Sequence, residues 1–186
     1  MPIPRLGSTT TYTRSILIVF SLLWLIAALK MPVLPDEAYY WTWSKDLSFQ
    51  YFDHPPLVAW VLALSISIFG DHLLGLRMAS LFSIAVSVGC TVLSTRLLLV
   101  DQSPEFRKRA DMLTVLALLS APMFTIGFLP MTPDPIEGAF TAVAVYSTLR
   151  ALRSEVPGVW CGVAVVCCVD YSISIDVVVA GVALTI

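Results

Sequence analysis

The chain has 186 residues, of which 58% are hydrophobic and only 13% are charged, and its mean hydropathy is +0.85. Soluble domains average about 45–50% apolar and about 25% charged residues, so this composition excludes an ordinary soluble domain and predicts an integral membrane protein. The net charge of −2 gives no support to nucleic acid as a partner. The four cysteines lie in apolar runs with no CxxC spacing, which is typical of small core residues rather than of a metal cage.

The first 30 residues predict a cytoplasmic tail followed by a transmembrane helix. Residues 1–14 are polar and carry Arg5 and Arg14, whereas residues 15–29 are almost entirely apolar. With its flanks, this apolar run approaches the ~20 residues needed to cross the hydrocarbon. No small-x-small cleavage site follows it, so we expect a retained anchor rather than a removed signal peptide.

Residues 31–56 form a polar island in the apolar chain. Pro32 and Pro35 end the preceding helix, and residues 36–45 could form a short helix at the membrane surface. The island is rich in tyrosine and tryptophan, which settle at headgroup depth. It also carries carboxylates and a histidine, and we therefore expect it to be a catalytic loop outside the cytoplasm.

The apolar segments that follow predict five spans in total and one shorter helix. Residues 57–69 are only about 13 residues long, which is typical of an interfacial or re-entrant helix. The further predicted spans are residues 73–100, 112–129, 136–149 and 159–186. No internal repeat is visible, so residues 1–186 are expected to be one all-α membrane domain.

Basic residues select between two topologies, because they favour the cytoplasmic side. If residues 57–69 turn back without crossing, Arg96 and the cluster at 107–109 lie inside, and both the 31–56 loop and Asp134 lie outside. If residues 57–69 cross fully, the cluster moves outside and Asp134 lies opposite Asp36. We favour the first arrangement.

Two groups in the 31–56 loop are candidates for chemistry. Asp36 and Glu37 could activate an acceptor as a general base, or they could be ordinary acids in the first turn of a helix. Asp53 could bind a divalent cation and His54 a phosphate, or the pair could simply form a turn ahead of a proline-initiated helix. The spacing alone does not decide between these readings.

Two further candidates lie outside this loop. Asp134 stands between two prolines and by itself reads as a helix cap. In the favoured topology, however, it shares one membrane face with Asp36 and Asp53, and such converging acids are costly unless a cation or substrate uses them. Arg77 opens a span on the outer side, where it could bind a phosphate bidentately or extend toward lipid headgroups.

Four spaced motifs carry a resemblance to a known family. They are DEAYYW at 36–41, YFDHPPL at 51–57, GLRM at 75–78 and TPD at 132–134. Together they resemble the bacterial branch of the polytopic GT-C glycosyltransferases, which includes the glycosyltransferase family 39 or protein-mannosyltransferase-like proteins and the lipid A aminoarabinose transferases. The resemblance covers roughly residues 14–153 and implies a GT-C-type helix bundle, of which this chain is the N-terminal portion.

The resemblance also implies a reaction and a set of roles. A sugar would pass from a polyprenyl-phosphate carrier to a lipid, glycan or protein acceptor, on the outer side of a bacterial inner membrane. Asp36 looks like the catalytic acid of the first loop, and Glu37 is its neighbour in the same signature. Asp53 and Asp134 match acids near a divalent metal ion of unknown identity, and His54 matches a position facing the carrier phosphate. Arg77 lies in a matching segment and is assigned to the phosphate by inference.

The chain departs from the family pattern in its last 30 residues. After about Val156 the resemblance is expected to fade. The sequence of residues 167–176 differs abruptly from the family pattern, as a shift of the reading frame would cause. We therefore set Asp170 and Asp176 aside and expect an N-terminal fragment or a truncated gene product. Two alternatives to an active enzyme remain open: an inactive membrane scaffold, and a small transporter subunit with acids along its path.

Overall fold

The computed structural model describes residues 9–49, 51, 54 and 56–153, and every regular element in this part of the chain is helical. The elements are α1 (Thr9–Lys30), α2 (Pro35–Trp43), α3 (Leu57–Phe69), α4 (Leu73–Leu98), α5 (Pro104–Ser120), the π-helical turn η1 (Met123–Gly127) and α6 (Pro133–Leu152). The expectation of an all-α protein is confirmed over these residues.

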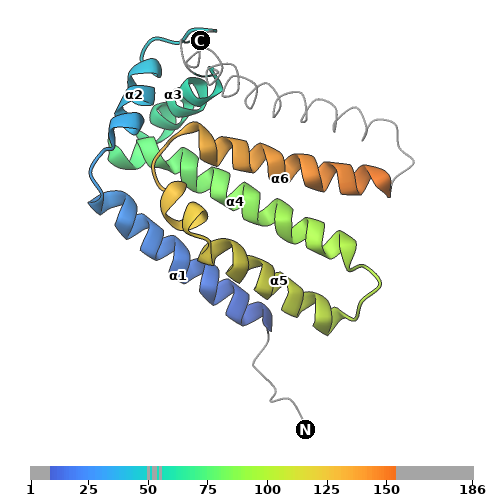
Figure 1. The fold of residues 1–186 in the computed structure, drawn as a ribbon. Coiled ribbons are helices and arrows are strands. Elements are labelled where there is room, and N and C mark those ends of the chain that lie inside the picture. Colours follow the sequence, from blue (N-terminus) through green and yellow to red (C-terminus); the bar gives the residue numbers. More distant parts are fainter. Residues whose placement is uncertain (1–8, 50, 52–53, 55, 154–186) are drawn as a thin grey trace, which may run out of the picture.

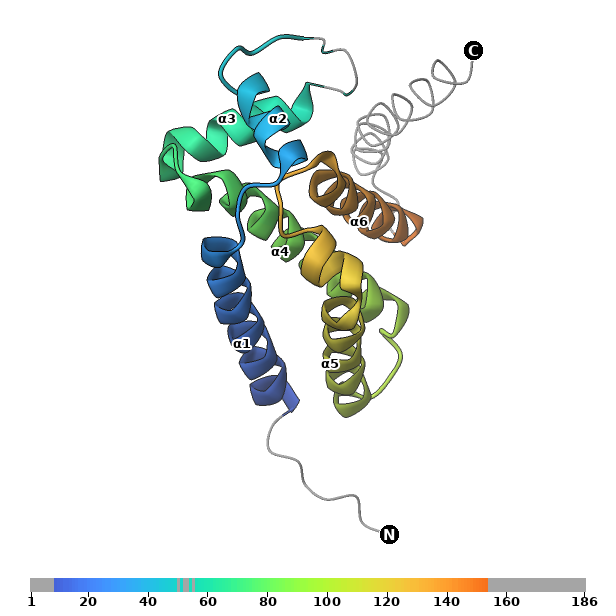
Figure 2. The ribbon, with the colours of Figure 1, turned by 60° about the vertical axis from the view of Figure 1, so that its left-hand side comes forward.

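The helix α4 is the centre of the bundle. It packs against α6 on one side and against α1 and α5 on the other, as Figure 1 shows. The short helices α2 and α3 pack on each other across one end of the long helices (Figure 2). The site described below is therefore built at that end, where α1 stops and α4 starts.

Side-chain contacts define the two ends of the bundle. At the first end, which we call the Glu37 end, Arg77 of α4 donates to the carbonyl of Ala28 near the end of α1, and Glu37 of α2 accepts from the amide of Met131 just before α6. At the opposite end, the Arg96 end, Arg96 of α4 pairs with Asp111 of α5. The helix α1 ends and α4 begins at the same end of the bundle. The intervening α3 therefore does not cross from one end to the other, and the favoured topology requires this.

The predicted number of spans is only partly recovered. Among the described helices, α1 and α4 are long and apolar enough to cross a membrane. The predicted span at residues 112–129 is wrong as a continuous helix: α5 ends at Ser120, and Ala121 is extended (ψ 125°), as expected for a residue before a proline, here Pro122. The predicted span at 159–186 lies outside the described residues.

Two apolar clusters hold the described helices together. The first joins α1, α4, α5 and the η1 region, and its buried members are Trp24, Ala28, Ile84, Val88, Val115, Leu119, Phe128 and Leu129. The second joins α2, α3, α4 and the start of α6, and its buried members are Tyr40, Val58, Leu62, Leu76, Ala79, Met131 and Ile136. The second cluster directly supports the Glu37 end.

The turn between α3 and α4 depends on two glycines, and this gives a test of the fold. Gly70 has φ +95°, and a Cβ on Gly75 would lie 1.9 Å from the Gly70 carbonyl oxygen. Since backbone cannot move aside cheaply, we expect Gly75→Ala to cost about 3 kcal/mol of stability. Thermal unfolding followed by circular dichroism in detergent would measure the loss.

The matched control is Gly89→Ala on the same helix. A Cβ at Gly89 would meet no atom within 4 Å, so removing this mid-helix glycine should leave stability unchanged or raise it by about 0.5–1 kcal/mol. Equal melting temperatures for the two variants would show that the close approach at Gly75 is not required.

Candidate functional site

A fully buried ion pair lies at the centre of the Glu37 end. The Arg77 Nε donates to Glu37 Oε1 at 2.8 Å, and Nη2 donates to Oε2 at 2.7 Å. Both side chains have 0% exposure. This bidentate geometry joins α2 to α4 across 40 positions of sequence.

The same ion pair also fixes the end of α1 and the approach to α6. Arg77 Nη1 donates to the carbonyls of Ala28 (2.6 Å) and Met31 (2.8 Å), and Nη2 donates to that of Pro32 (2.9 Å). The Met131 amide donates to Glu37 Oε1 at 3.3 Å. Four segments of the chain therefore meet at one pair of side chains, and one carbonyl that α1 leaves free at its last turn, that of Ala28, is satisfied.

This geometry changes the roles predicted for Arg77 and Glu37. All five N–H groups of Arg77 are used within the protein, and the side chain is sealed from solvent. It therefore has no donor to offer a carrier phosphate, nor does it extend toward headgroups. Glu37 is equally enclosed, so neither side chain presents a polar group at the surface of this structure.

Asp36 lies beside this pair but has the opposite environment. The helix α2 begins at Pro35, and successive helix residues point in directions about 100° apart, so Glu37 faces the interior while Asp36 is exposed. Asp36 makes no hydrogen bond or ion pair with any described residue. Its carboxylate is therefore free to meet a substrate at the surface.

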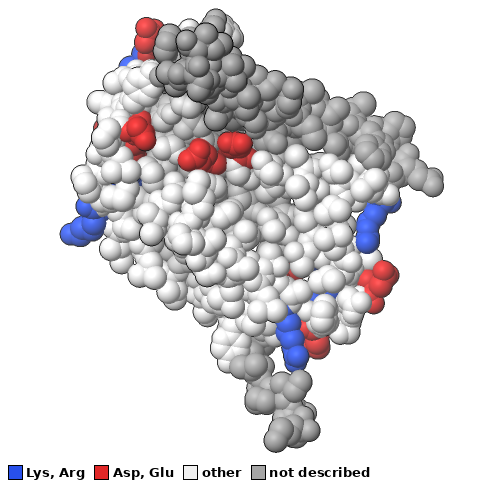
Figure 3. Space-filling view, in the orientation of Figure 1, with Lys and Arg blue, Asp and Glu red and all other residues white. Residues whose placement is uncertain are grey.

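Asp134 is exposed in the first turn of α6, at the same end of the bundle. Figure 3 shows carboxylates over the region of α2 and the beginning of α6, while Lys and Arg side chains appear toward both ends of this face. The structure thus brings Asp36 and Asp134 to one end, as the sequence predicted. Asp53 lies outside the described residues, so its part in this cluster stays a prediction.

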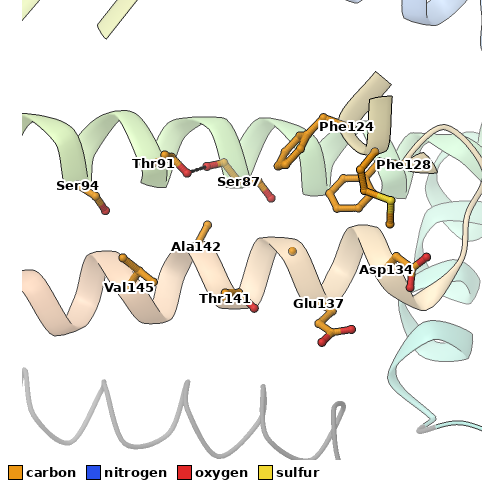
Figure 4. A pocket seen from close by; sticks show the side chains of 12 residues that line it. Ser87, Thr91, Ser94, Phe124, Phe128, Asp134, Glu137, Thr141, Ala142 and Val145 are labelled. Carbon is orange, nitrogen blue, oxygen red and sulfur yellow. Dashed lines mark hydrogen bonds between the residues drawn. The ribbon is translucent and has the colours of Figure 1, made fainter. Parts of the chain in front are cut away.

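A groove of about 530 Å³ runs from Asp134 along the face between α4 and α6. Figure 4 shows Asp134 at its beginning, Ser87 and Thr91 on α4, and the Phe128 ring closing one side. The hydroxyls of Ser87 and Thr91 bond to carbonyls of their own helix, so the α4 side of the groove is mainly apolar, whereas the α6 side also carries Glu137 and Thr141. A groove with acids near one end and a mainly apolar wall can hold a molecule with a polar head and a hydrocarbon tail.

His54 also lies at the Glu37 end. Its ring packs against Tyr40, with 5.7 Å between the ring centroids, and its Nδ1 is buried without a hydrogen-bond partner among the described residues. An unpartnered buried nitrogen is a ready ligand for a polar group. Among the described residues, no group of three or more His, Cys, Asp or Glu side chains is placed to hold a metal ion.

The aromatic residues of the 31–56 loop hold one another in place. Trp43 and Tyr51 stack with a centroid distance of 4.2 Å and an angle of 7°, and Tyr51 Oη donates to the carbonyl of Asp46 at 2.9 Å. The sequence predicts that these rings lie at the lipid interface. Here they also order the chain that follows α2.

Sequence reasoning missed a second contact that holds α2 in place. Asp71, in the turn before α4, accepts from the Trp41 indole at 2.9 Å and pairs with Lys45. The bonds from Lys45 and Trp41 lower the pKa of the Asp71 carboxyl. Both bonds are therefore present at neutral pH and weaken only as the pH falls through this lowered pKa.

Comparison with known proteins bears on the family of the chain. The family described as dolichyl-phosphate-mannose-protein mannosyltransferase matches residues 53–186. A relative from Pseudomonas fluorescens, undecaprenyl phosphate-alpha-4-amino-4-deoxy-L-arabinose arabinosyl transferase 2, is 29% identical over an alignment of 120 residues that covers 54% of this chain and 21% of the relative. The matched stretch thus spans about a fifth of the relative's length. No solved structure gives a significant match.

The family match also corrects one expectation about the C-terminal part. It continues through residue 186, beyond the Val156 at which the resemblance was expected to fade. The hypothesis of a shifted reading frame concerns residues 157–186, which lie outside the described residues. The match covers well over half of the chain; it includes the motif at 132–134 and begins within the motif at 51–57, whereas the motif at 36–41 precedes it. The chain therefore belongs to the dolichyl-phosphate-mannose-protein mannosyltransferase family, a group of GT-C glycosyltransferases.

Proposed function

We propose that the chain forms part of a membrane glycosyltransferase that takes a sugar from a polyprenyl-phosphate carrier. The observation that carries the proposal is the contrast between two neighbouring acids in the first turn of α2: Glu37 is buried in an ion pair with Arg77, whereas Asp36 is exposed. The buried Glu37–Arg77 pair holds α2 in place and thereby fixes the position of the Asp36 carboxylate. The name of the bacterial relative, which acts on undecaprenyl phosphate linked to an amino sugar, supports a carrier of this class.

The charge distribution supports an extracytoplasmic position for this end. The Arg96 end carries most of the basic side chains of the described residues, including Arg96 and the cluster at 107–109. Basic residues favour the cytoplasmic side of an inner membrane. The Glu37 end, with Asp36 and Asp134, would then face the outer side, where an acceptor lipid, glycan or protein would approach.

In the proposed reaction, Asp36 acts as the general base. Its carboxylate accepts the proton of an acceptor hydroxyl or amine, the acceptor atom bonds to the anomeric carbon, and the bond from that carbon to the phosphate oxygen breaks. The electron pair leaves on the carrier phosphate. Because this phosphate is already a good leaving group, positioning and charge stabilisation supply most of the remaining catalysis.

The phosphate must be held by groups other than Arg77. His54 remains a candidate, because its Nδ1 is buried and unpartnered beside Tyr40. Asp53 and Asp134 would hold a divalent cation, since carboxylate oxygens suit hard cations such as Mg²⁺ or Mn²⁺. Asp134 fits this role because it is exposed at the same end as Asp36. A bound cation would neutralise charge on the leaving phosphate.

The reaction class can be tested with the chain reconstituted in liposomes. We expect release of free undecaprenyl phosphate from an undecaprenyl-phosphate sugar when membrane lipids and proteins are supplied as acceptors. A nucleotide sugar should not be consumed under the same conditions. Turnover of the nucleotide sugar alone would contradict the proposal, and no turnover of either donor would favour the scaffold. Ion flux without sugar transfer would favour the transporter.

A further inference from the structure

A second cavity lies at the Arg96 end, far from the proposed sugar-transfer site. It has a volume of about 320 Å³ and is bounded by α1, α4 and α5. Its polar lining comes from Thr10 and Thr13 in the first turns of α1, Arg96 near the end of α4, and Lys108 and Asp111 in α5. The rest of the lining is almost entirely apolar, so the cavity joins a charged mouth to a hydrocarbon-like wall.

The mouth of this cavity has an excess of positive charge. Arg96 pairs with Asp111 through Nε (3.0 and 3.1 Å) and through Nη2 (2.8 Å), so the one carboxylate of the lining is already neutralised. Among the described residues, Lys108 forms its one ion pair with the exposed Glu105, at 3.2 Å, and such surface pairs are weak. The Arg96 and Lys108 side chains are 55% and 47% exposed, so both cations remain accessible to an anion.

The wall of the cavity keeps space that the protein does not fill. Gly89 lies in the middle of α4 and lines the cavity, and a Cβ there would meet no atom within 4 Å. A glycine inside a helix lowers stability by about 0.5–1 kcal/mol relative to alanine. An alanine at position 89 would fit without a clash and would stabilise the helix, yet the sequence has glycine there. Leu17, Val92 and Val115 form the apolar surroundings.

We propose that this cavity binds an anionic phospholipid. The headgroup phosphate would lie against Arg96 and Lys108, with the Thr10 hydroxyl as a further donor, and one acyl chain would lie along α4 over Gly89. Basic pockets between membrane helices bind anionic headgroups in this manner. A free phosphate would use the cations but not the apolar wall, whereas a phospholipid uses both. The inference is independent of the proposed transfer reaction, which uses the other end of the bundle.

Binding can be measured by native mass spectrometry of the purified chain with phosphatidylglycerol and phosphatidylcholine. We expect phosphatidylglycerol to bind more tightly, and Lys108→Gln to weaken it about fivefold, as one basic residue at an anionic surface should. The matched control is Lys45→Gln, because Lys45 is also about half exposed (45%) and paired with one acid, but lies at the Glu37 end. This control should leave the affinity unchanged.

A second variant tests the wall without changing any charge. Gly89→Leu should place its side chain in the cavity and reduce phosphatidylglycerol binding about tenfold or more, while circular dichroism shows an intact helix content. Equal affinity for the two lipids, equal losses in Lys108→Gln and Lys45→Gln, or full binding by Gly89→Leu would each overturn the proposal. Displacement of the lipid by inorganic phosphate at equal concentration would show a phosphate site instead.

Discussion

Replacing Arg77 with methionine is expected to destabilise the bundle by about 3–5 kcal/mol, because it leaves the Glu37 carboxylate buried without a partner. The loss also removes the donors to three carbonyls at and just beyond the end of α1. Glu37→Gln should cost less, because a neutral amide can still accept from Met131 and Arg77. Unfolding in detergent, followed by circular dichroism, measures both effects.

Arg96→Met is the matched control for this prediction. It removes an arginine from the same helix and breaks a bidentate pair with Asp111, but the Arg96 side chain is 55% exposed. We expect a loss of about 1 kcal/mol or less, since exposed ion pairs contribute little. A comparable loss in Arg77→Met and Arg96→Met would show that burial of the Glu37–Arg77 pair does not matter.

The double variant Glu37→Leu with Arg77→Met separates the ion pair from its other contacts. Removing both charges takes away the cost of an isolated buried carboxylate, so part of the lost stability should return. Recovery should be incomplete, because Ala28, Met31 and Pro32 still lack donors for their carbonyls. Strictly additive losses would contradict the direct coupling between the two side chains.

The sequence predicted the elements of the Glu37 end well, for physical reasons. The bounds of α3 follow from an apolar run between Pro56 and Gly70, and both expected and observed helices cover Leu57–Phe69. The position of Asp134 at the same end as Asp36 followed from counting basic residues. The first inference depends on the composition of one segment, and the second on the preference of basic residues for the cytoplasmic side. Neither requires knowledge of side-chain packing.

The pairings at this end could not be predicted in the same way. Glu37 and Arg77 are 40 positions apart, and Asp36 is as acidic as Glu37, so the sequence did not show which of the two faces the interior. The rotation of α2 is set by its packing on α3 and α4. One signal was available: a guanidinium near the start of an apolar helix requires a partner, and an acid is the strongest one.

Asp36→Asn is expected to lower the rate of sugar transfer by about 10²–10⁴-fold, because an amide cannot accept the acceptor's proton. Since Asp36 is exposed and forms no hydrogen bond or ion pair with a described residue, the variant should keep the melting temperature of the parent chain. The measurement is the release of undecaprenyl phosphate from its sugar conjugate, with kcat and KM determined separately. The loss should appear in kcat, since the carboxylate acts on the acceptor and not on the carrier.

Asp101→Asn provides the matched control for the loss of one exposed carboxylate. Asp101 lies in the turn between α4 and α5, at the Arg96 end, and we expect this variant to retain full activity. Arg77→Met should also lose activity, but together with stability, whereas Asp36→Asn should lose activity alone. Unchanged turnover in Asp36→Asn would remove Asp36 from the mechanism. A rise in KM without a fall in kcat would make Asp36 a binding residue for the acceptor instead of its base.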